Sequence, residues 1–353
     1  MAGPPVSEST VSESTVSEPT VSGPTVSGPT VSGPTVSEPT VSAVVPTLGR
    51  SRWLTACLEA IRVAGGSEVE ILVVDQARPS LALDRRLADR VLRPGGARLG
   101  FAGANNLALG AARGRYLATI NDDAIIARDW FEPLLAVLER EHRVAAVQGT
   151  NVMLDTETRI DGRGIGWNRW WQAVQIDRGL EADAAPRTPH AVYGVSATAA
   201  LWRREALETL GQGRPEAWFD PRLSAYYEDV DVAGRLRAAG WCARTVPAAR
   251  ARHAGSTTGN TLPQRAQALV YGNRHLVLAR LLGRSYWPRL PRLLLRDLAD
   301  LWQSQRHQDA ELARGILRGW WRAGLRLGKF VRFGAPLVPL GDLRRFALGD
   351  LRA

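Results

Sequence analysis

Residues 116–123 read Tyr-Leu-Ala-Thr-Ile-Asn-Asp-Asp, an apolar run followed at once by one amide and two carboxylates. The run has the length and the β-branched and aromatic content of a buried strand. Upstream, residues 70–75 read Glu-Ile-Leu-Val-Val-Asp, and residues 41–45 form another short apolar run. Helical stretches separate these runs, so the sequence predicts an α/β fold, with a mostly parallel sheet flanked by helices on both faces.

The same patterning extends in both directions from this segment. Strands are expected at 41–45, 70–75, 90–92, 116–120, 144–147 and 241–246, and helices at 51–64, 81–88, 101–113, 129–141, 203–210 and 230–239. After about Leu262 the chain is helical and basic to its end. We therefore expect an α/β domain at 41–261 and a basic, amphipathic helical region at 262–353.

The first 40 residues have a different composition. Residues 6–40 are seven pentapeptides of the form Val-Ser-(Glu/Gly)-(Ser/Pro)-Thr. Such a density of proline, glycine and serine cannot build a core, which predicts a disordered tail at 1–40. The repeats are interpreted either as an adhesive or phosphorylated stalk or as a tandem duplication.

The charge and the cysteine content limit the classes of protein to which this chain can belong. The net charge is +10, and from Arg274 onward there are 16 basic and 6 acidic residues, which favours an anionic partner, either membrane or nucleic acid. Cys57 and Cys242 have no metal-ligand spacing, and no disulfide framework is expected. No positive charge precedes Arg50 and no apolar run reaches ~18 residues, so a cytoplasmic protein without a membrane span is expected.

Two of the predicted strands end in acidic side chains. In an open α/β sheet, ligands bind at the carboxyl ends of strands. Asp75 there can accept hydrogen bonds from a nucleobase or ribose, or it can cap a turn. Asp122 and Asp123 are adjacent carboxylates, which favour a divalent cation such as Mg²⁺ or Mn²⁺ carried with a diphosphate.

A second acidic cluster precedes the helix predicted at 230–239. Residues 226–231 read Tyr-Tyr-Glu-Asp-Val-Asp, and three acids in four positions exceed what a helix cap needs. One of them is a candidate general base for an incoming hydroxyl. His253, flanked by arginine and followed by glycine, is either structural or placed for phosphate contact or metal ligation.

Taken in order, these motifs resemble those of glycosyltransferase family 2, in particular a bacterial branch that includes rhamnosyltransferases and other cell-surface polysaccharide enzymes. The resemblance spans about residues 41–280. It rests on ValValProThr–Gly-Arg, IleLeuValValAsp, GlyPheAlaGlyAlaAsnAsn, AsnAspAsp, PheAspProArg–TyrTyrGluAspValAsp and Val-Pro–His. Leu223-Ser224 stand where the family usually has a pair of aromatic residues.

This resemblance implies a GT-A fold and roles for particular residues. Nucleotide or donor binding falls on Pro46, Thr47, Asp75, Asn106, Asp122, Gly194 and Ser196. Metal binding falls on Asp123 and His253. The catalytic base is Asp229, with Glu228 beside it.

The predicted activity is a metal-dependent, inverting transfer of a hexosyl or rhamnosyl-like sugar. The donor is a nucleotide-diphosphate sugar, the cofactor Mn²⁺ or Mg²⁺, and the acceptor a saccharide or lipid-linked hydroxyl in bacterial cell-envelope polysaccharide biosynthesis. One alternative is a sugar-phosphate nucleotidyltransferase. Another is a non-enzymatic, repeat-tailed nucleic-acid or surface-binding protein, although the acidic clusters would repel nucleic acid and no nucleic-acid partner is expected.

The basic C-terminal region has its own periodicity. Arg314, Arg318, Arg322 and Arg326 recur every four residues, beside an apolar stripe formed by Leu312, Ile316, Trp320, Leu327 and Phe330. A helix of this composition can lie peripherally on an anionic membrane. Alternatively, the apolar stripe packs on the catalytic domain, with glycines marking close helix contacts.

Overall fold

The computed structural model describes residues 1, 3, 39–95, 98–211, 214–255, 264–331 and 334–348. The chain divides into two units, Met1–Ser37 and Glu38–Ala353, and the account below concerns the second. The tail predicted at 1–40 lies outside the described residues, except for Met1, Gly3, Pro39 and Thr40.

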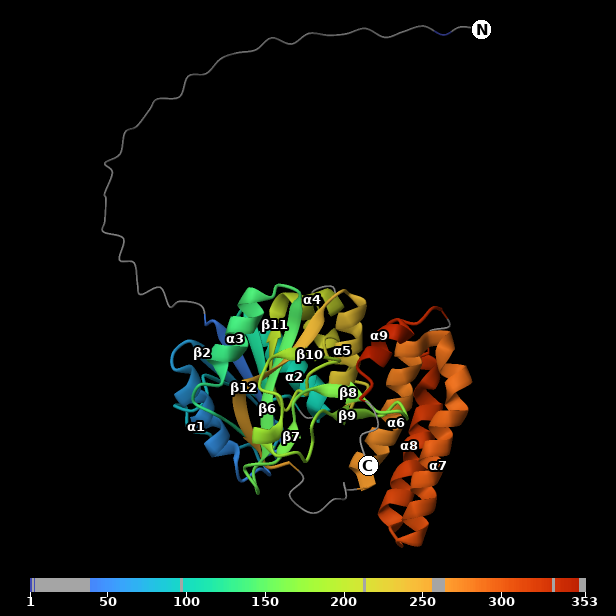
Figure 1. The fold of residues 1–353 in the computed structure, drawn as a ribbon. Helices are drawn as coiled ribbons and strands as arrows, with labels where there is room; N and C mark the ends of the chain where they lie inside the picture. Colours follow the sequence, from blue (N-terminus) through green and yellow to red (C-terminus); the bar gives the residue numbers. More distant parts are fainter. Residues whose placement is uncertain are drawn as a thin grey trace, which may run out of the picture. The chain divides into compact units, whose positions relative to one another are not determined.

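A ten-stranded sheet forms the centre of the α/β part (Figure 1). Its main path runs in the order β10-β12-β6-β11-β4-β1-β2-β3. The strands are β1 (Val41–Thr47), β2 (Val69–Asp75), β3 (Arg90–Leu92), β4 (Tyr116–Ile120), β6 (Val144–Met153), β10 (His190–Val192), β11 (Ala199–Arg203) and β12 (Cys242–His253). Only β10 and β11 on this path run against the others, which confirms a mostly parallel sheet.

Short strands extend this arrangement at its ends. β5 (Ala124–Ile126) pairs with β12, and β7 (Ile160–Gly162) pairs with β6. A separate hairpin joins β8 (Ile165–Trp167) to β9 (Ala173–Gln175). Thr47 is paired with Asp75 at the ends of β1 and β2, so the parallel strands deliver their polar terminal residues to one edge of the sheet.

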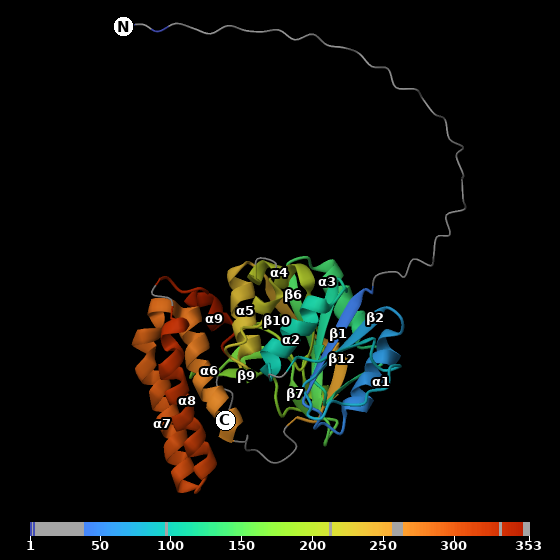
Figure 2. The ribbon, with the colours of Figure 1, turned by 180° about the vertical axis from the view of Figure 1, so that it is seen from behind.

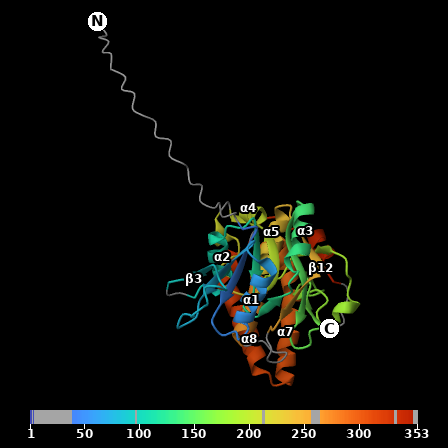
Figure 3. The same cartoon turned by 90° about the vertical axis from the view of Figure 1, so that its left-hand side faces the viewer.

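Helices cover both faces of the sheet because the strands are apolar on both sides. Helices α1 (Leu54–Gly65) and α3 (Phe131–Arg140) pack against one face. The other face carries α2 (Gly100–Ala111), α4 (Arg204–Gly211) and α5 (Glu228–Ala238). Figure 3 views the molecule from the side on which α1 lies, with β3 at the sheet edge.

Most predicted elements are confirmed, and two of the strands are longer than expected. β6 and β12 continue to Met153 and His253 because they pair with each other along most of their length. The prediction of a helix at 81–88 is wrong, because this stretch is an irregular loop. The amide of Leu81 donates to the Asp75 carboxylate, which fixes the start of the loop outside a helix.

The C-terminal region is helical, as predicted. α6 (Gln264–Leu282), α7 (Leu290–Arg306) and α8 (Ala310–Arg326) lie side by side next to the α/β part, followed by α9 (Leu340–Arg345) (Figures 1 and 2). Short 3₁₀ turns are η1 (Ala182–Ala184), η2 (Pro215–Ala217), η3 (Gly283–Arg289) and η4 (Leu327–Lys329). No helix in the described ranges is long and apolar enough to cross a membrane.

The apolar stripe noted in the sequence of α8 faces inward. Ile316 is fully buried and Phe330 is 2% exposed, and both belong to the packed interior of the helical region. A Cβ on Gly272 of α6 would lie 2.9 Å from the carbonyl oxygen of Gly319 on α8, so the two glycines allow close helix packing. Of the two interpretations of this stripe, packing is the one the structure supports.

Candidate active site

The first acidic group lies where β1 and β4 end. Thr47 Oγ1 donates a 2.5 Å hydrogen bond to Asp122 Oδ2, and Ser51 Oγ donates to the Asp122 carbonyl at 2.9 Å. Burial raises the pKa of Asp122 to about 6, with a further contribution from the charge of Asp123 and an opposing one from the Thr47 hydrogen bond. The structure therefore brings Pro46, Thr47 and Asp122 together, as the sequence predicted.

Asp123 points toward the end of β12 and meets His253 there. The Asp123 Oδ1 and His253 Nε2 atoms are 3.3 Å apart. The backbone amide of Ala254, which follows β12, also donates a 3.0 Å hydrogen bond to the backbone carbonyl of Asp123. Burial lowers the pKa of His253, but the hydrogen bonds and charges of Asp123 and Asp161 outweigh it and raise the pKa to about 9. The predicted metal pair is thus assembled across two strands.

Asp161 on β7 completes this arrangement, and sequence analysis missed it. Its Oδ2 is 2.8 Å from His253 Nδ1, and Arg178 Nη1 is 3.0 Å from its other oxygen. A carboxylate on the far nitrogen of a histidine fixes the ring and the tautomer for metal binding through the near nitrogen. A lone aspartate in the irregular stretch 151–200 carried no signal that would have singled it out.

These side chains fit a divalent ion shared with a substrate. Among the described residues, no group of three or more histidine, cysteine, aspartate or glutamate side chains is gathered to hold a metal. Asp123 and His253 would therefore supply two ligands, leaving the remaining positions for diphosphate and water oxygens. One imidazole nitrogen with one carboxylate suits a transition ion such as Mn²⁺, whereas Mg²⁺ prefers oxygen ligands alone.

The second acidic group sits at the start of α5. Asp229 accepts a 2.8 Å hydrogen bond from the Val230 amide, and the Ala197 amide and the Ser196 side chain lie close enough to favour its ionised form. Burial raises the pKa of Asp229, and these groups oppose the rise. Burial also raises the pKa of Glu228, whose Oε2 has no hydrogen-bond partner. The two neighbouring carboxyls thus differ in how well their charge is stabilised.

The segment 194–198 connects the two acidic groups. At one end, Asn121, which precedes the acid doublet, donates from its amide to the Thr198 carbonyl at 2.8 Å. Toward the other, Ser196 and Ala197 lie near Asp229 and lower the pKa of its carboxyl. A Cβ on Gly194 would collide with Ala233 of α5, so glycine there allows α5 to pack closely. Gly194 thus lies against α5 and Ser196 near the base candidate, and their predicted contacts with a donor stay predictions.

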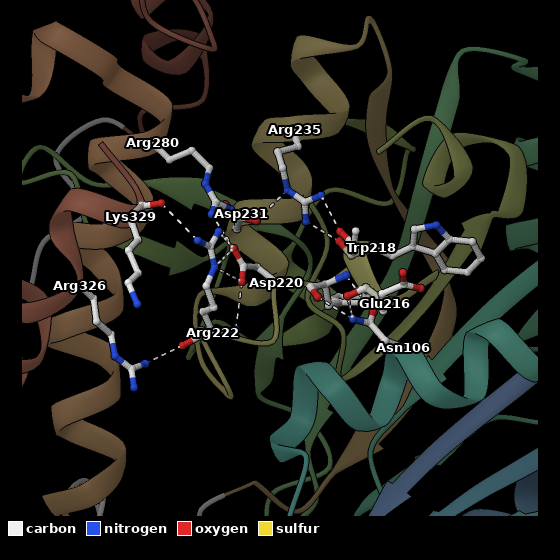
Figure 4. A network of polar contacts seen from close by, with 12 residues as sticks. Asn106, Glu216, Trp218, Asp220, Arg222, Asp231, Arg235, Arg280, Arg326 and Lys329 are labelled. Carbon is white, nitrogen blue, oxygen red and sulfur yellow. Dashed lines mark hydrogen bonds and ion pairs between the residues drawn. The ribbon is translucent and has the colours of Figure 1, made fainter. Parts of the chain in front are cut away.

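Two predicted donor-binding residues are engaged within the chain. Asp75 is buried, and its oxygens accept from the amides of Ala77 and Leu81 at 2.9 Å and from Arg93 Nε at 3.2 Å. Asn106 donates to the carbonyls of Glu216 and Phe219 and accepts from the Phe219 amide (Figure 4). Both shape loops near the site, and their contacts with a donor stay predictions.

An ion network ties α6 to this site, and sequence analysis missed it too. Arg280 on α6 donates to Asp220 and Asp231, both at 2.5 Å, while Arg222 and Arg235 pair with the same two carboxylates (Figure 4). Asp231, one of the three acids of the cluster, is therefore committed to ion pairs. That leaves Glu228 and Asp229 as the candidates for chemistry.

The turn before Glu228 is held in an unusual conformation. Ser224, Tyr226 and Tyr227 have φ angles of 68°, 63° and 68°, a region that non-glycine residues seldom adopt. Asn273 of α6 donates from Nδ2 to the carbonyls of Leu223, Ala225 and Tyr226 at 2.8–2.9 Å. Helix α6 thus maintains the turn that presents the acid pair.

The mostly parallel sheet, with an acid doublet after β4 and an acid pair opening α5, agrees with the GT-A fold that the sequence predicted. Residues 42–211 match the model of glycosyl transferase family 2, and through this segment the chain belongs to that family. A search of the curated proteins gives no match.

Several solved structures are similar in fold. GalNAc-T7 with UDP, GalNAc and Mn²⁺ is 14% identical, covering 84% of this chain and 55% of that one, with a TM-score of 0.49. The mannosyltransferase PcManGT from Pyrobaculum calidifontis, with GDP-Man and Mn²⁺, is 19% identical, covering 82% and 76%, with a TM-score of 0.49. S. aureus TarS is 14% identical, covering 78% and 54%, with a TM-score of 0.43. The chain thus spans about half the length of the first and third of these proteins.

Proposed function

We propose that this chain transfers a sugar from a nucleotide-diphosphate donor to an acceptor hydroxyl, with inversion and with a divalent metal. The observation that carries the proposal is the segment 194–198: its Thr198 carbonyl accepts from the Asn121 amide, and its Ser196 and Ala197 lie close enough to Asp229 to lower the pKa of that carboxyl. It places a candidate metal pair and a candidate base around one short stretch of chain. A single in-line displacement needs these two functions on opposite sides of the anomeric carbon.

On the donor side, Asp123 and His253 would hold the ion, with Asp161 orienting the imidazole. When bound, the ion supplies positive charge that stabilises the departing diphosphate. Asp122, fixed by Thr47, faces the same edge of the sheet, where the nucleoside would lie together with the loop shaped by Asp75. The protein thereby separates the task of binding the leaving group from that of activating the nucleophile.

On the acceptor side, Asp229 takes the proton of the attacking hydroxyl. The acceptor oxygen forms a bond to the anomeric carbon as the bond from that carbon to the diphosphate oxygen breaks, which inverts the configuration. Asp229 is favoured over Glu228 because the Val230 amide, the nearby Ala197 and Ser196 groups and the α5 N-terminus stabilise its ionised form. Glu228 lies beside it with a buried oxygen that has no hydrogen-bond partner, and we assign to it the positioning of the acceptor.

The finer assignments follow from the resemblance found in the sequence. We propose a hexosyl or rhamnosyl donor and a saccharide or lipid-linked acceptor of bacterial cell-envelope polysaccharide synthesis. Mn²⁺ is favoured over Mg²⁺ on the donor set of Asp123 and His253.

A screen of UDP-, GDP- and dTDP-sugars with Mn²⁺, Mg²⁺ or chelator tests the proposal. A true donor at 100 times its Kd should stabilise the protein by ~2.7 kcal/mol, and only with metal present. Product NMR should then show inversion at the anomeric carbon. Formation of a nucleotide sugar from a nucleoside triphosphate and a sugar phosphate, with release of pyrophosphate, would support the nucleotidyltransferase alternative instead.

A further inference from the structure

The outward surface of α7 and α8 is apolar and exposed. In the described part of the chain, 13 large hydrophobic side chains are exposed, and seven of them lie between residues 287 and 325. We call the six on the two long helices the outer face: Leu295 (62% exposed), Leu298 (48%), Trp302 (58%), Leu317 (50%), Trp321 (72%) and Leu325 (66%). Their concentration on one helix pair sets this surface apart from the rest of the molecule.

Helical periodicity places these residues on one side of each helix. On α8, residues 317, 321 and 325 are spaced by four, and on α7, residues 295, 298 and 302 follow the same stripe. The opposite side of α8 is packed, with Ile316 fully buried and Ala323 at 6% exposure. Helix α8 therefore has two apolar stripes, one packed in the protein and one open to solvent, whereas the buried side of α7 carries Leu293, Asp297, Asp300 and Ser304.

Charged side chains of α7 and α8 are sorted in the same way. The acids of α7 are turned inward: Asp297 pairs with Arg274 at 2.6 Å and His275 at 3.0 Å, and Asp300 pairs with Arg296 at 2.5 Å. By contrast, three exposed arginines border the outer face, namely Arg306, Arg314 and Arg318. The Arg306 guanidinium lies 4.0 Å from the ring centroid of Trp302. Glu311 is the exposed acid of α8, so the three arginines outnumber it and the outward surface is cationic as well as apolar.

We propose that the outer face docks the protein on an anionic phospholipid surface, with the two helices lying in the interface. Exposed tryptophan and leucine side chains enter the headgroup region, and arginines alongside them pair with lipid phosphates. A second copy of the chain is a poorer occupant, because a two-fold contact would bring the arginine borders of both copies together. The stripe involved is not the one that the sequence periodicity had suggested.

The orientation of the helices gives the docking a role in the reaction, a step that rests on the proposed function. Figures 1 and 2 show the turn between α7 and α8 projecting on the side of the molecule where β1 and its parallel neighbours end. The candidate active site occupies that edge of the sheet. Because the helices lie flat in the interface, the edge that carries the site would stay open along the membrane surface, where a lipid-linked acceptor presents its hydroxyl.

Sedimentation with vesicles tests the docking without any donor or acceptor, so its outcome does not depend on transferase activity. The full-length protein should pellet with vesicles of phosphatidylcholine and phosphatidylglycerol, and much less with phosphatidylcholine alone. Raising the salt from about 0.05 to about 0.5 M should release a large part of it, since screening shortens the range of the charge attraction. Equal partitioning between the two vesicle types, or no pelleting at low salt, would overturn the proposal.

Two sets of variants locate the contact. Trp302→Asp with Trp321→Asp should weaken vesicle binding by roughly tenfold or more, and Arg314→Gln with Arg318→Gln should reduce its salt dependence. The matched controls are Val63→Asp with Leu180→Asp, which remove exposed apolar side chains elsewhere, and Arg85→Gln with Arg128→Gln. Unchanged binding by the Trp302 and Trp321 variant would refute the assignment. If the parent protein were a dimer without lipid, and the Trp302 and Trp321 substitutions made it a monomer, the outer face would be a contact between two copies of the chain instead.

Discussion

The side-chain amide of Asn273 donates a 2.8 Å hydrogen bond to the carbonyl oxygen of Tyr226, and so joins α6 to the turn before the acid pair. The same nitrogen reaches the carbonyls of Leu223 and Ala225. Because Tyr226 and Tyr227 both have positive φ angles, the turn stores strain that its surroundings must offset. Helix α6 therefore supports the turn that presents the candidate acid pair, in addition to any docking role of the C-terminal helices.

Replacement of Asn273 by alanine should affect both stability and turnover. The buried carbonyl of Leu223 and the partly buried carbonyls of Ala225 and Tyr226 would lose this donor, at a cost of about 1–3 kcal/mol in the free energy of unfolding. A relaxed turn would displace Asp229, and a misplacement near 1 Å can lower kcat by roughly 100-fold. Urea denaturation and steady-state kinetics on the folded variant measure the two effects.

The control for this variant lies on the same helix. Tyr271→Phe removes a 3.1 Å hydrogen bond from α6 to Asp300, away from the turn. It should lower stability slightly and leave kcat unchanged. If the two variants had equal kcat values under conditions where both are folded, Asn273 would have only a structural role.

The ion network around Arg280 predicts a dependence of stability on pH. Burial alone would raise the pKa of Asp220, but hydrogen bonds from Arg222 and Arg280 outweigh it and hold the pKa well below its usual range. A folded-state pKa below the unfolded value of ~3.9 contributes stability at neutral pH that is lost as the pH falls below about 4. Arg280→Gln should cost about 3–5 kcal/mol at pH 7, because it leaves Asp220 and Asp231 without this cation.

Urea denaturation at pH 7 and pH 3 measures this effect. The difference between parent and Arg280→Gln should shrink at the lower pH, where the benefit of the pair is fading. Arg244→Gln is the control, because its partner Glu141 and Arg244 itself are about one-third exposed and the pair should be worth about 1 kcal/mol or less. A constant difference across the pH range would contradict the assigned role of Asp220.

Sequence patterning predicted the elements that bury apolar residues with a regular period. β1, β2, β4, α2 and α5 were found within a few residues, because each combines an apolar period with a polar residue at its end. The same logic placed Asp122, Asp123 and Glu228-Asp229 at element ends. The prediction of a helix at 81–88 was wrong. The Leu81 amide there donates to Asp75, a contact that helical periodicity does not reveal, and this hydrogen bond fixes a loop.

The sequence could not predict side-chain contacts that depend on the tertiary fold. Asp161 reaches His253 only because β7 pairs with the end of β6 beside β12. Asn273 and Arg280 look like ordinary residues of a basic helix, and their contacts depend on how α6 packs against the turn. Periodicity likewise could not tell which of the two apolar stripes of α8 faces the protein.

The metal pair should depend on the aspartate behind the histidine. Asp123→Asn should abolish metal-dependent donor binding, measured by calorimetry with Mn²⁺. Asp161→Asn should weaken metal affinity by roughly 10- to 100-fold, since the imidazole loses the carboxylate that orients it. Asp183→Asn, whose side chain is 81% exposed, is the control and should bind as the parent does. Donor binding by Asp123→Asn at parental affinity would move the metal elsewhere.

The assignment of Asp229 as the base makes the sharpest prediction. Asp229→Asn removes the proton acceptor but keeps the size of the side chain, so kcat should fall by roughly 10²- to 10⁴-fold while donor affinity changes little. Since burial raises the pKa of Asp229, kcat/KM of the parent should rise with pH through an apparent pKa above the usual aspartate range. That acid limb should disappear in the variant, because an amide does not titrate.

Glu228→Gln separates the two neighbouring acids. Its buried Oε2 makes no hydrogen bond, so the change should raise the KM for the acceptor more than it lowers kcat, and the acid limb should remain. If Glu228→Gln instead removed the limb and Asp229→Asn kept full activity, the base would be Glu228. Inversion would still be required in either case, because one carboxylate acting on the acceptor hydroxyl permits only a single displacement. Retention of configuration in the product NMR spectrum would therefore rule out both assignments at once.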